Sequence, residues 1–190
     1  MANANAARGL VPVRDAATSN HVNALRRYSC PSSYATALFI GDPVIKTGTA
    51  DADGYSEVNL ASAGGSITGV VCGFEDVASM QAGYGVASTT RAVLVDDNPA
   101  TLYEIQEDAV GGALAVTGIG LNADLIAASG STFLKTSGWM LDTSTAATTA
   151  TLQVKIIEFQ HRADVEVGNA NSKVLVKINK HTELAGQAGI

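Results

Sequence analysis

Aromatic side chains and charged side chains are both scarce in this sequence. One Trp, five Tyr and four Phe make up 5% of the 190 residues, so the apolar share of 46% consists mainly of smaller side chains such as Ala and Val. Charged residues account for 16%, well below the ~25% of ordinary soluble domains. A surface with so little charge is typical of chains that are packed in assemblies, which indicates a structural role.

Cysteine is also scarce, as are the segments that would direct a chain into a membrane. Cys30 and Cys72 are too few for a disulfide framework and their spacing fits no metal motif, so we expect two small buried side chains. Residues 1–9 lack the charged start and apolar run of a signal peptide. No apolar run approaches the ~20 residues of a membrane span. These features predict synthesis in a cytoplasm, no membrane partner and no cofactor.

The formal charge of −6 is unevenly distributed along the chain. Residues 1–30 hold four arginines and one aspartate, a net charge of +3. Residues 41–142 hold three basic and thirteen acidic side chains, a net charge of −10. A protein that wraps nucleic acid needs a basic face, so this acidic stretch predicts no nucleic-acid partner. The basic start is the part that suits an acidic partner.

The chain changes character near residue 31. Residues 1–30 show no helical or strand periodicity, and we expect an extended N-terminal arm there. Residues 31–190 alternate short Val-, Ile-, Thr- and Tyr-rich runs with Gly, Asp, Asn and Pro clusters, which predicts an all-β body, a β-sandwich or jelly roll. The expected strands are Tyr34–Ile40, Pro43–Thr47, Ser56–Leu60, Ile67–Glu75, Arg91–Val95, Leu102–Glu107, Thr132–Lys135, Thr149–Phe159 and Lys173–Asn179.

Two of these runs carry the clearest patterns. In residues 173–179, Val174, Val176 and Ile178 fall on one face of the expected strand, as in a half-buried strand. In residues 149–159 the apolar side chains fall on one face of the expected strand up to Ile156 and on the opposite face after it. We expect either a bulge at that point or a strand that changes sheets.

No catalytic or metal motif emerges. His21, His161 and His181 are far apart and lie near no recognisable nucleophile motif, so we expect no enzymatic activity. The segment Asp51–Glu57 resembles part of a calcium loop, but its Asp-Gly pair between two expected strands favours a hairpin turn. The glycine spacing of residues 118–123 lacks the strand and helix of a dinucleotide fingerprint. We expect Glu104, Glu107 and Asp108 to form a solvated acidic edge.

Six stretches between about Leu25 and His181 carry a resemblance to a known family: Gly41–Val44, Ile67–Phe74, Tyr103–Gly112, Gly120–Asp124, Thr143–Lys155 and Lys173–Asn179. They resemble capsid decoration, or cement, proteins of podovirus-like and related tailed bacteriophages. The resemblance implies a jelly-roll-like body on the outer capsid surface that bridges neighbouring major capsid proteins, with no active site.

The resemblance and the low charge together predict a homotrimer on the virion, with a dimer as the alternative. The charge distribution predicts that the basic arm lies on the capsid while the acidic body faces solution. An alternative function is a receptor- or glycan-binding virion module, with Trp139, Tyr55 and Tyr84 as stacking platforms. The expected capsid-contacting residues are Arg8, Leu10, Val11, Val13, Arg14, Leu25, Arg26 and Arg27.

Overall fold

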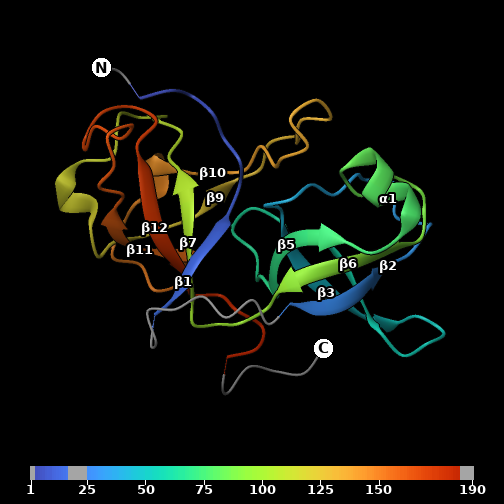
Figure 1. Cartoon of the computed structure of the whole chain (residues 1–190). Coiled ribbons are helices and arrows are strands. Elements are labelled where there is room, and N and C mark those ends of the chain that lie inside the picture. Colours follow the sequence, from blue (N-terminus) through green and yellow to red (C-terminus); the bar gives the residue numbers. More distant parts are fainter. Residues whose placement is uncertain (1–2, 17–24, 185–190) are drawn as a thin grey trace.

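The computed structural model describes residues 3–16 and 25–184, and nearly all of its regular structure is β-strand. The all-β class predicted from the sequence is confirmed. Two groups of strands lie side by side, a closed barrel and an open sheet (Figure 1). The described strands form several mainly antiparallel sheets, which is consistent with the predicted all-β sandwich.

The barrel is closed by five short strands in the order β2-β4-β3-β5-β6, with β6 pairing back to β2. All pairs are antiparallel except β2 with β4. Alternation places Arg91, Val93 and Val95 of β6 inside. The strands are β2 (Arg26–Cys30), β3 (Pro43–Ala50), β4 (Ser56–Leu60), β5 (Gly69–Phe74) and β6 (Arg91–Asp96).

The sheet is antiparallel, in the order β1-β7-β12-β11-β8. Val174, Val176 and Ile178 are buried, as the alternation predicted. Ile156 pairs with Val176 and Glu158 with Leu175, so Ile157 is the extra residue of a bulge. The bulge expected from the parity change is therefore confirmed. The strands are β1 (Val11–Asp15), β7 (Thr101–Gln106), β8 (Asn122–Ala123), β11 (Val154–Phe159) and β12 (Lys173–Ile178).

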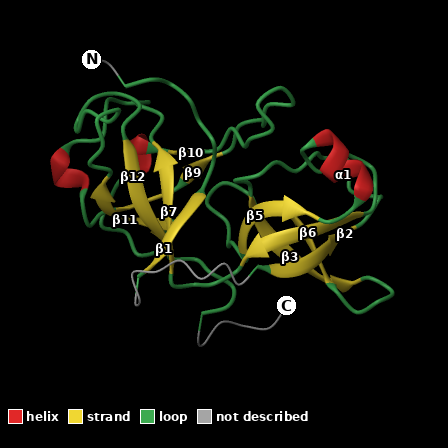
Figure 2. Ribbon diagram, in the orientation of Figure 1, coloured by secondary structure: helices red, strands yellow, loops and turns green. Residues whose placement is uncertain are grey.

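The remaining elements are short. The helix α1 (Val77–Ala82) is capped at its start by Asp76, whose carboxylate accepts from the Ser79 N–H at 2.8 Å, and at its end by Gly83 with φ of 77°. Figure 2 shows α1 beside the barrel. The others are the strand pair β9 (Leu125–Ile126) and β10 (Met140–Leu141) and the 3₁₀ turns η1 (Val116–Gly118) and η2 (Thr143–Thr145).

The expected N-terminal arm is instead part of the two strand groups. Strand β1 pairs with β7 of the sheet, and β2 pairs with β6 of the barrel. Leu10 is fully buried in the sheet core. Five-residue strands with arginine and proline carry little periodicity, and pairing with distant strands determines their state. The proposed boundary at residue 30 therefore does not separate an arm from a body in the described residues.

Two other expected strands take different forms. Residues 34–40 make only isolated bridges, through Leu38 and Ile40. Residues 132–135 form a turn, in which Lys135 has φ of 63°. The Thr, Phe and Leu of this segment suit a strand by composition, but no neighbouring strand is available to pair with them.

The barrel and the sheet are joined tightly. The Leu10 N–H donates to the Gly41 carbonyl at 2.9 Å, and the Ile67 N–H donates to the Lys180 carbonyl at 2.8 Å. Gly41 has φ of 95°, and a Cβ there would lie 2.2 Å from the Arg8 carbonyl oxygen. Only glycine fits this approach. Because backbone meets backbone here, the two strand groups form a stiff joint.

Candidate functional site

The residues expected to contact the capsid do not form one free surface. Leu10 is 0% exposed and belongs to the sheet core, so it cannot make an outer contact, which corrects that part of the prediction. Val11 and Leu25 are partly buried, and Val13 is 38% exposed. The apolar side chains of this segment serve mainly to hold β1 against the sheet.

The four arginines of the same segment are exposed or half-buried, and each lies near an acid of its own chain. Arg14 pairs with Glu158 at 2.5 Å, and Arg26 pairs with Asp97 at 3.0 Å. Arg27 lies 3.4 Å from Glu75, and Arg8 lies 4.0 Å from Glu104. The positive charge seen in the sequence is therefore largely neutralised locally.

Of the three histidines, two lie in the described residues, and they differ in environment. His181 is fully buried, and its Nδ1 accepts from the Glu183 N–H at 3.1 Å. Burial lowers the pKa of His181 to about 4, although Glu183 and Asp97 oppose the shift. His161 is exposed, and His21 lies outside the described residues.

Within residues 3–16 and 25–184, no three His, Cys, Asp or Glu side chains gather closely enough to hold a metal ion. The Asp51–Glu57 segment forms the turn between β3 and β4, as predicted. Asp51 Oδ1 accepts from the N–H groups of Asp53 and Tyr55 at 3.0 and 2.9 Å, so this oxygen stabilises the turn.

The expected solvated acidic edge is wrong for two of its three members. Glu104 is 6% exposed and Glu107 is fully buried. Glu104 accepts two hydrogen bonds from Arg162, at 2.8 and 3.2 Å. Asp108 accepts from Thr143 Oγ1 at 3.0 Å. These carboxylates organise loops of the sheet, and strand alternation alone could not reveal those partners.

Of the three aromatic residues considered as glycan platforms, Trp139 is buried and the two tyrosine rings are each engaged by a side chain of this protein. Trp139 is 1% exposed. The Arg27 guanidinium lies 4.3 Å over the Tyr55 ring, and Lys135 Nζ lies 4.9 Å over the Tyr84 ring. Tyr84 also stacks on Phe39 with ring centroids 5.1 Å apart. A sugar ring needs an exposed aromatic face, so this geometry does not favour glycan binding.

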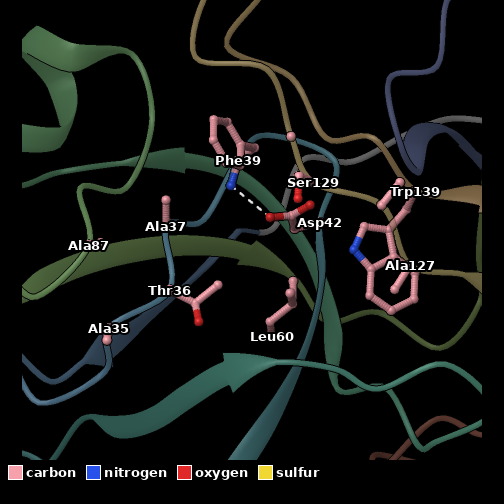
Figure 3. Close-up of a pocket in the computed structure, with 12 residues that line it drawn as sticks. Ala35, Thr36, Ala37, Phe39, Asp42, Leu60, Ala87, Ala127, Ser129 and Trp139 are labelled. Atoms are coloured by element: carbon pink, nitrogen blue, oxygen red, sulfur yellow. Dashed lines mark hydrogen bonds between the residues drawn. The ribbon is translucent and has the colours of Figure 1, made fainter.

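A cavity of about 620 Å³ opens beside the barrel, where the loop after β2 meets the loop between β9 and β10. Its walls are mostly small and apolar (Figure 3). Asp42 lies in the wall, where its Oδ2 accepts from the Phe39 N–H at 2.8 Å. Burial raises the pKa of Asp42 to about 6. The lining residues are Ala35, Thr36, Ala37, Phe39, Asp42, Leu60, Ala87, Ala127, Ala128, Ser129, Gly130 and Trp139.

The loop between β9 and β10 also presents the most exposed large apolar side chain of the described residues. Phe133 is 89% exposed and Leu134 is 61% exposed. We call these two residues the apolar tip. The Lys135 N–H donates to the Ser131 carbonyl at 2.7 Å, and the Leu134 N–H donates to Ser131 Oγ at 3.0 Å. The tip is therefore an ordered turn, and the sequence signal for it was a Phe-Leu pair within a Gly-, Ser- and Thr-rich segment.

A second group of exposed apolar side chains lies on the loops after β7. Val110 is 57% exposed, Val116 is 61% exposed and Ile119 is 39% exposed. We call these three residues the sheet-end group. Val77 and Met80 on α1, at the barrel end, are 67% and 57% exposed. Figure 1 places η1 and α1 at opposite ends of the molecule, so exposed apolar surface occurs at both ends.

Comparison with protein-family models, curated proteins and solved structures finds no match to this chain. In the described residues, no helix combines the length and the apolar character that crossing a bilayer requires. The geometry described above is therefore the basis for assigning a function.

Proposed function

We propose that this chain is a capsid decoration (cement) protein, which binds the outer surface of a bacteriophage head and stabilises it by bridging neighbouring major capsid proteins. One observation carries this proposal beyond the sequence resemblance. A stiff all-β body exposes large apolar side chains at two opposite ends, Val77 and Met80 on α1 at the barrel end and Val116 on η1 at the sheet end. A bridging protein needs at least two contact surfaces that a rigid body holds at a fixed separation.

The stabilisation follows from mass action. A protein that binds the expanded shell, and not its dissociated parts, shifts the equilibrium toward the intact shell. Each contact is allowed to be weak, since many symmetric copies act together and multivalency raises the overall affinity. The low charge of the chain, 16% of residues, suits a surface that is covered by protein over much of its area.

The proposal includes a partner, a location and an oligomeric state. The partner is the major capsid protein, the location is the outer surface of the virion, and the expected state is a homotrimer, with a dimer as the alternative. The jelly-roll-like architecture of the resembled family is not needed for this role, since a barrel joined firmly to a sheet is also a rigid spacer.

Addition of the purified chain to expanded phage heads that lack it tests the proposal. We expect the chain to sediment with the heads at a copy number on the order of hundreds per head, as a repeated surface site requires. The heads should then resist heating better than undecorated heads. Absence from the pelleted heads at saturating concentration, or only a handful of copies per head, would contradict the proposal.

The sheet-end group provides a matched pair of variants for the same assay. Val116→Ser with Ile119→Ser removes exposed apolar surface and should weaken head binding. Thr90→Ala changes an exposed side chain outside both exposed apolar groups and should leave binding unchanged. Equal loss of binding in both variants would point to a general defect of the protein and not to a contact at the sheet end.

A further inference from the structure

We propose that the apolar tip of one copy of this chain inserts into the 620 Å³ cavity of a second copy. The chain carries both halves of the contact, an exposed Phe133–Leu134 pair and an apolar-walled cavity that its own tip does not fill. The inference rests on the proposed function and deepens it, because it assigns the apolar tip to contact between copies. The exposed apolar side chains of α1 and η1 are then left for the shell.

The cavity has the size and the chemistry to accept the tip. Its volume of about 620 Å³ lies within the ~300–1,000 Å³ of pockets that enclose small molecules. Five alanines and Leu60 line it, Phe39 and Trp139 lie behind them at 6% and 1% exposure, and Asp42 is also part of the wall. An entering Phe ring would therefore pack mainly against small apolar side chains, whose burial with it is favourable.

The indole N–H of Trp139 is a polar group of the cavity wall. The backbone N–H of Trp139 donates to Ser137 Oγ at 3.1 Å, but no hydrogen bond of the indole N–H occurs among the described residues. Figure 3 shows the indole nitrogen facing the cavity. An entering turn brings backbone carbonyl oxygens with it, and one of these would accept the indole hydrogen. The cavity therefore suits a peptide turn better than a purely apolar ligand.

The tip has the properties of a binding anchor. Residues 131 and 136 pair as an isolated antiparallel bridge that closes the turn at its base. Lys135 packs against Gly83 and its ammonium lies over the Tyr84 ring, which fixes the tip to the segment after α1. Because the turn is already ordered, binding costs little additional conformational entropy. A pre-formed, exposed aromatic side chain is typical of interface hot spots.

The positions of the tip and the cavity in the chain favour a second copy over an unrelated partner. Residues 127–130 line the cavity and residues 133–134 form the tip, so both belong to one loop. Two copies related by a two-fold axis can therefore exchange tips in one symmetric contact, which closes without leaving a free tip or a free cavity. A head-to-tail ring of three copies uses the same contact.

Sedimentation velocity of the purified chain tests the inference without any phage head. The monomer mass is 19.4 kDa, and we expect two or three times this mass at tens of micromolar. Two copies indicate exchange about a two-fold axis, and three copies indicate the ring. A wild-type chain that stays monomeric up to 100 μM, well above the ~μM range of standard interfaces, would overturn the inference.

Two variants each remove one half of the contact. Phe133→Ser with Leu134→Ser removes the tip, and Ala127→Trp fills the cavity from an exposed position. Each variant alone should raise the dissociation constant at least 100-fold. Val116→Ser, on η1 and as exposed as Leu134, should change it less than two-fold. Wild-type assembly of either contact variant would overturn the inference.

A mixture of the two contact variants makes the decisive measurement. The tip variant keeps an open cavity and the cavity variant keeps its tip, so together they can form one of the two contacts that neither forms alone. We expect the mixture, and neither variant by itself, to give heterodimers. If the chain fails to bind heads but assembles with itself as described, the proposed function is contradicted and the inference stands. If the chain binds heads but does not assemble with itself, the inference is contradicted and the proposed function stands.

Discussion

In the barrel, Arg91 is fully buried and its guanidinium donates to the carbonyl oxygens of Thr36, Tyr34 and Thr89 at 2.7, 2.9 and 3.2 Å. In the sheet, Glu107 is fully buried. These two fully buried side chains carry charges of opposite sign. Burial lowers the pKa of Arg91, but an arginine remains charged at any ordinary pH.

Glu107 accepts hydrogen bonds from backbone N–H groups, whereas Arg91 donates hydrogen bonds to backbone carbonyl oxygens. Its carboxylate accepts from the N–H groups of Ala109 and Ser172 at 2.7 and 3.2 Å. Burial raises the pKa of Glu107, although these hydrogen bonds oppose the shift. In each group of strands a buried charged side chain therefore fixes the backbone of a loop. Of Arg91 and Glu107, only Glu107 can be neutralised by binding a proton.

The largest effect is expected from removing the barrel charge. Arg91→Met leaves the carbonyl oxygens of three loop residues without their donor, so the free energy of unfolding should fall by about 4 kcal/mol. Urea denaturation followed by the fluorescence of Trp139, the only tryptophan, measures this change. Lys155→Met, at an exposed position of β11, is the control and should change stability by less than about 0.5 kcal/mol. A loss below about 1 kcal/mol for Arg91→Met would contradict this account of the barrel.

Two buried titratable side chains, Asp42 and His181, lie near the contact between the barrel and the sheet, and their pKa values shift in opposite directions. The pKa of Asp42 rises from 3.8 to about 6, so its contribution to stability is present below pH 4 and is lost as pH rises through 6. The pKa of His181 falls from 6.5 to about 4, so its contribution is present above pH 6.5 and is lost as pH falls through 4. Each contribution is about 3 kcal/mol, because one pKa unit corresponds to about 1.4 kcal/mol.

Because the two slopes oppose each other over the same window, they should nearly cancel in the wild-type protein. Asp42→Asn should leave a stability that rises between pH 4 and pH 6.5, and His181→Gln should leave one that falls. Urea midpoints measured at half-unit pH steps give both slopes, and the slope rather than the absolute stability is the readout. Parallel profiles of the two variants would show that these groups do not titrate in opposition.

A smaller effect is expected at the sheet charge. Glu107→Ala removes the acceptor of two backbone N–H groups and should cost about 2 kcal/mol. Glu107→Gln keeps one carbonyl oxygen and should recover about half of that loss. Hydrogen exchange of the Ser172 amide reports the local effect, since this N–H donates to the carboxylate. If both variants lose the same stability, acceptance by the remaining oxygen has no measurable value.

The elements that the sequence predicted well are those whose pattern is local. The alternation of Val174, Val176 and Ile178 predicted β12, although Leu175 on the other face is buried too, and the parity change predicted the bulge at Ile157. The Asp53-Gly54 pair predicted the turn between β3 and β4. In each case neighbouring residues determine the conformation, because side-chain period and turn chemistry act over only a few positions.

The features that the sequence did not predict depend on residues far apart in the chain. Strand β1 forms because it pairs with β7, about ninety residues later. Glu104 is buried because Arg162 meets it. The apolar tip is exposed because residues 132–135 have no strand to pair with. The cavity exists where five separate stretches of the chain meet, which no local pattern encodes.

The smallest effect should separate two ion pairs of the sheet that look alike in sequence. Arg14 and Glu158 are 41% and 43% exposed, whereas Arg162 meets a Glu104 side chain that is 7% exposed. Water and salt screen the first pair, so a double-mutant cycle with Gln substitutions should give a coupling of about 0.3 kcal/mol. The two parallel hydrogen bonds to a buried carboxylate should give the second pair about 1.5 kcal/mol. Raising the salt to 1 M should abolish the first coupling and keep most of the second, since screening acts mainly on exposed charges. Equal couplings in the two cycles would show that burial of Glu104 adds nothing to its pairing, and the distinction between buried and exposed charge in this sheet would then fail.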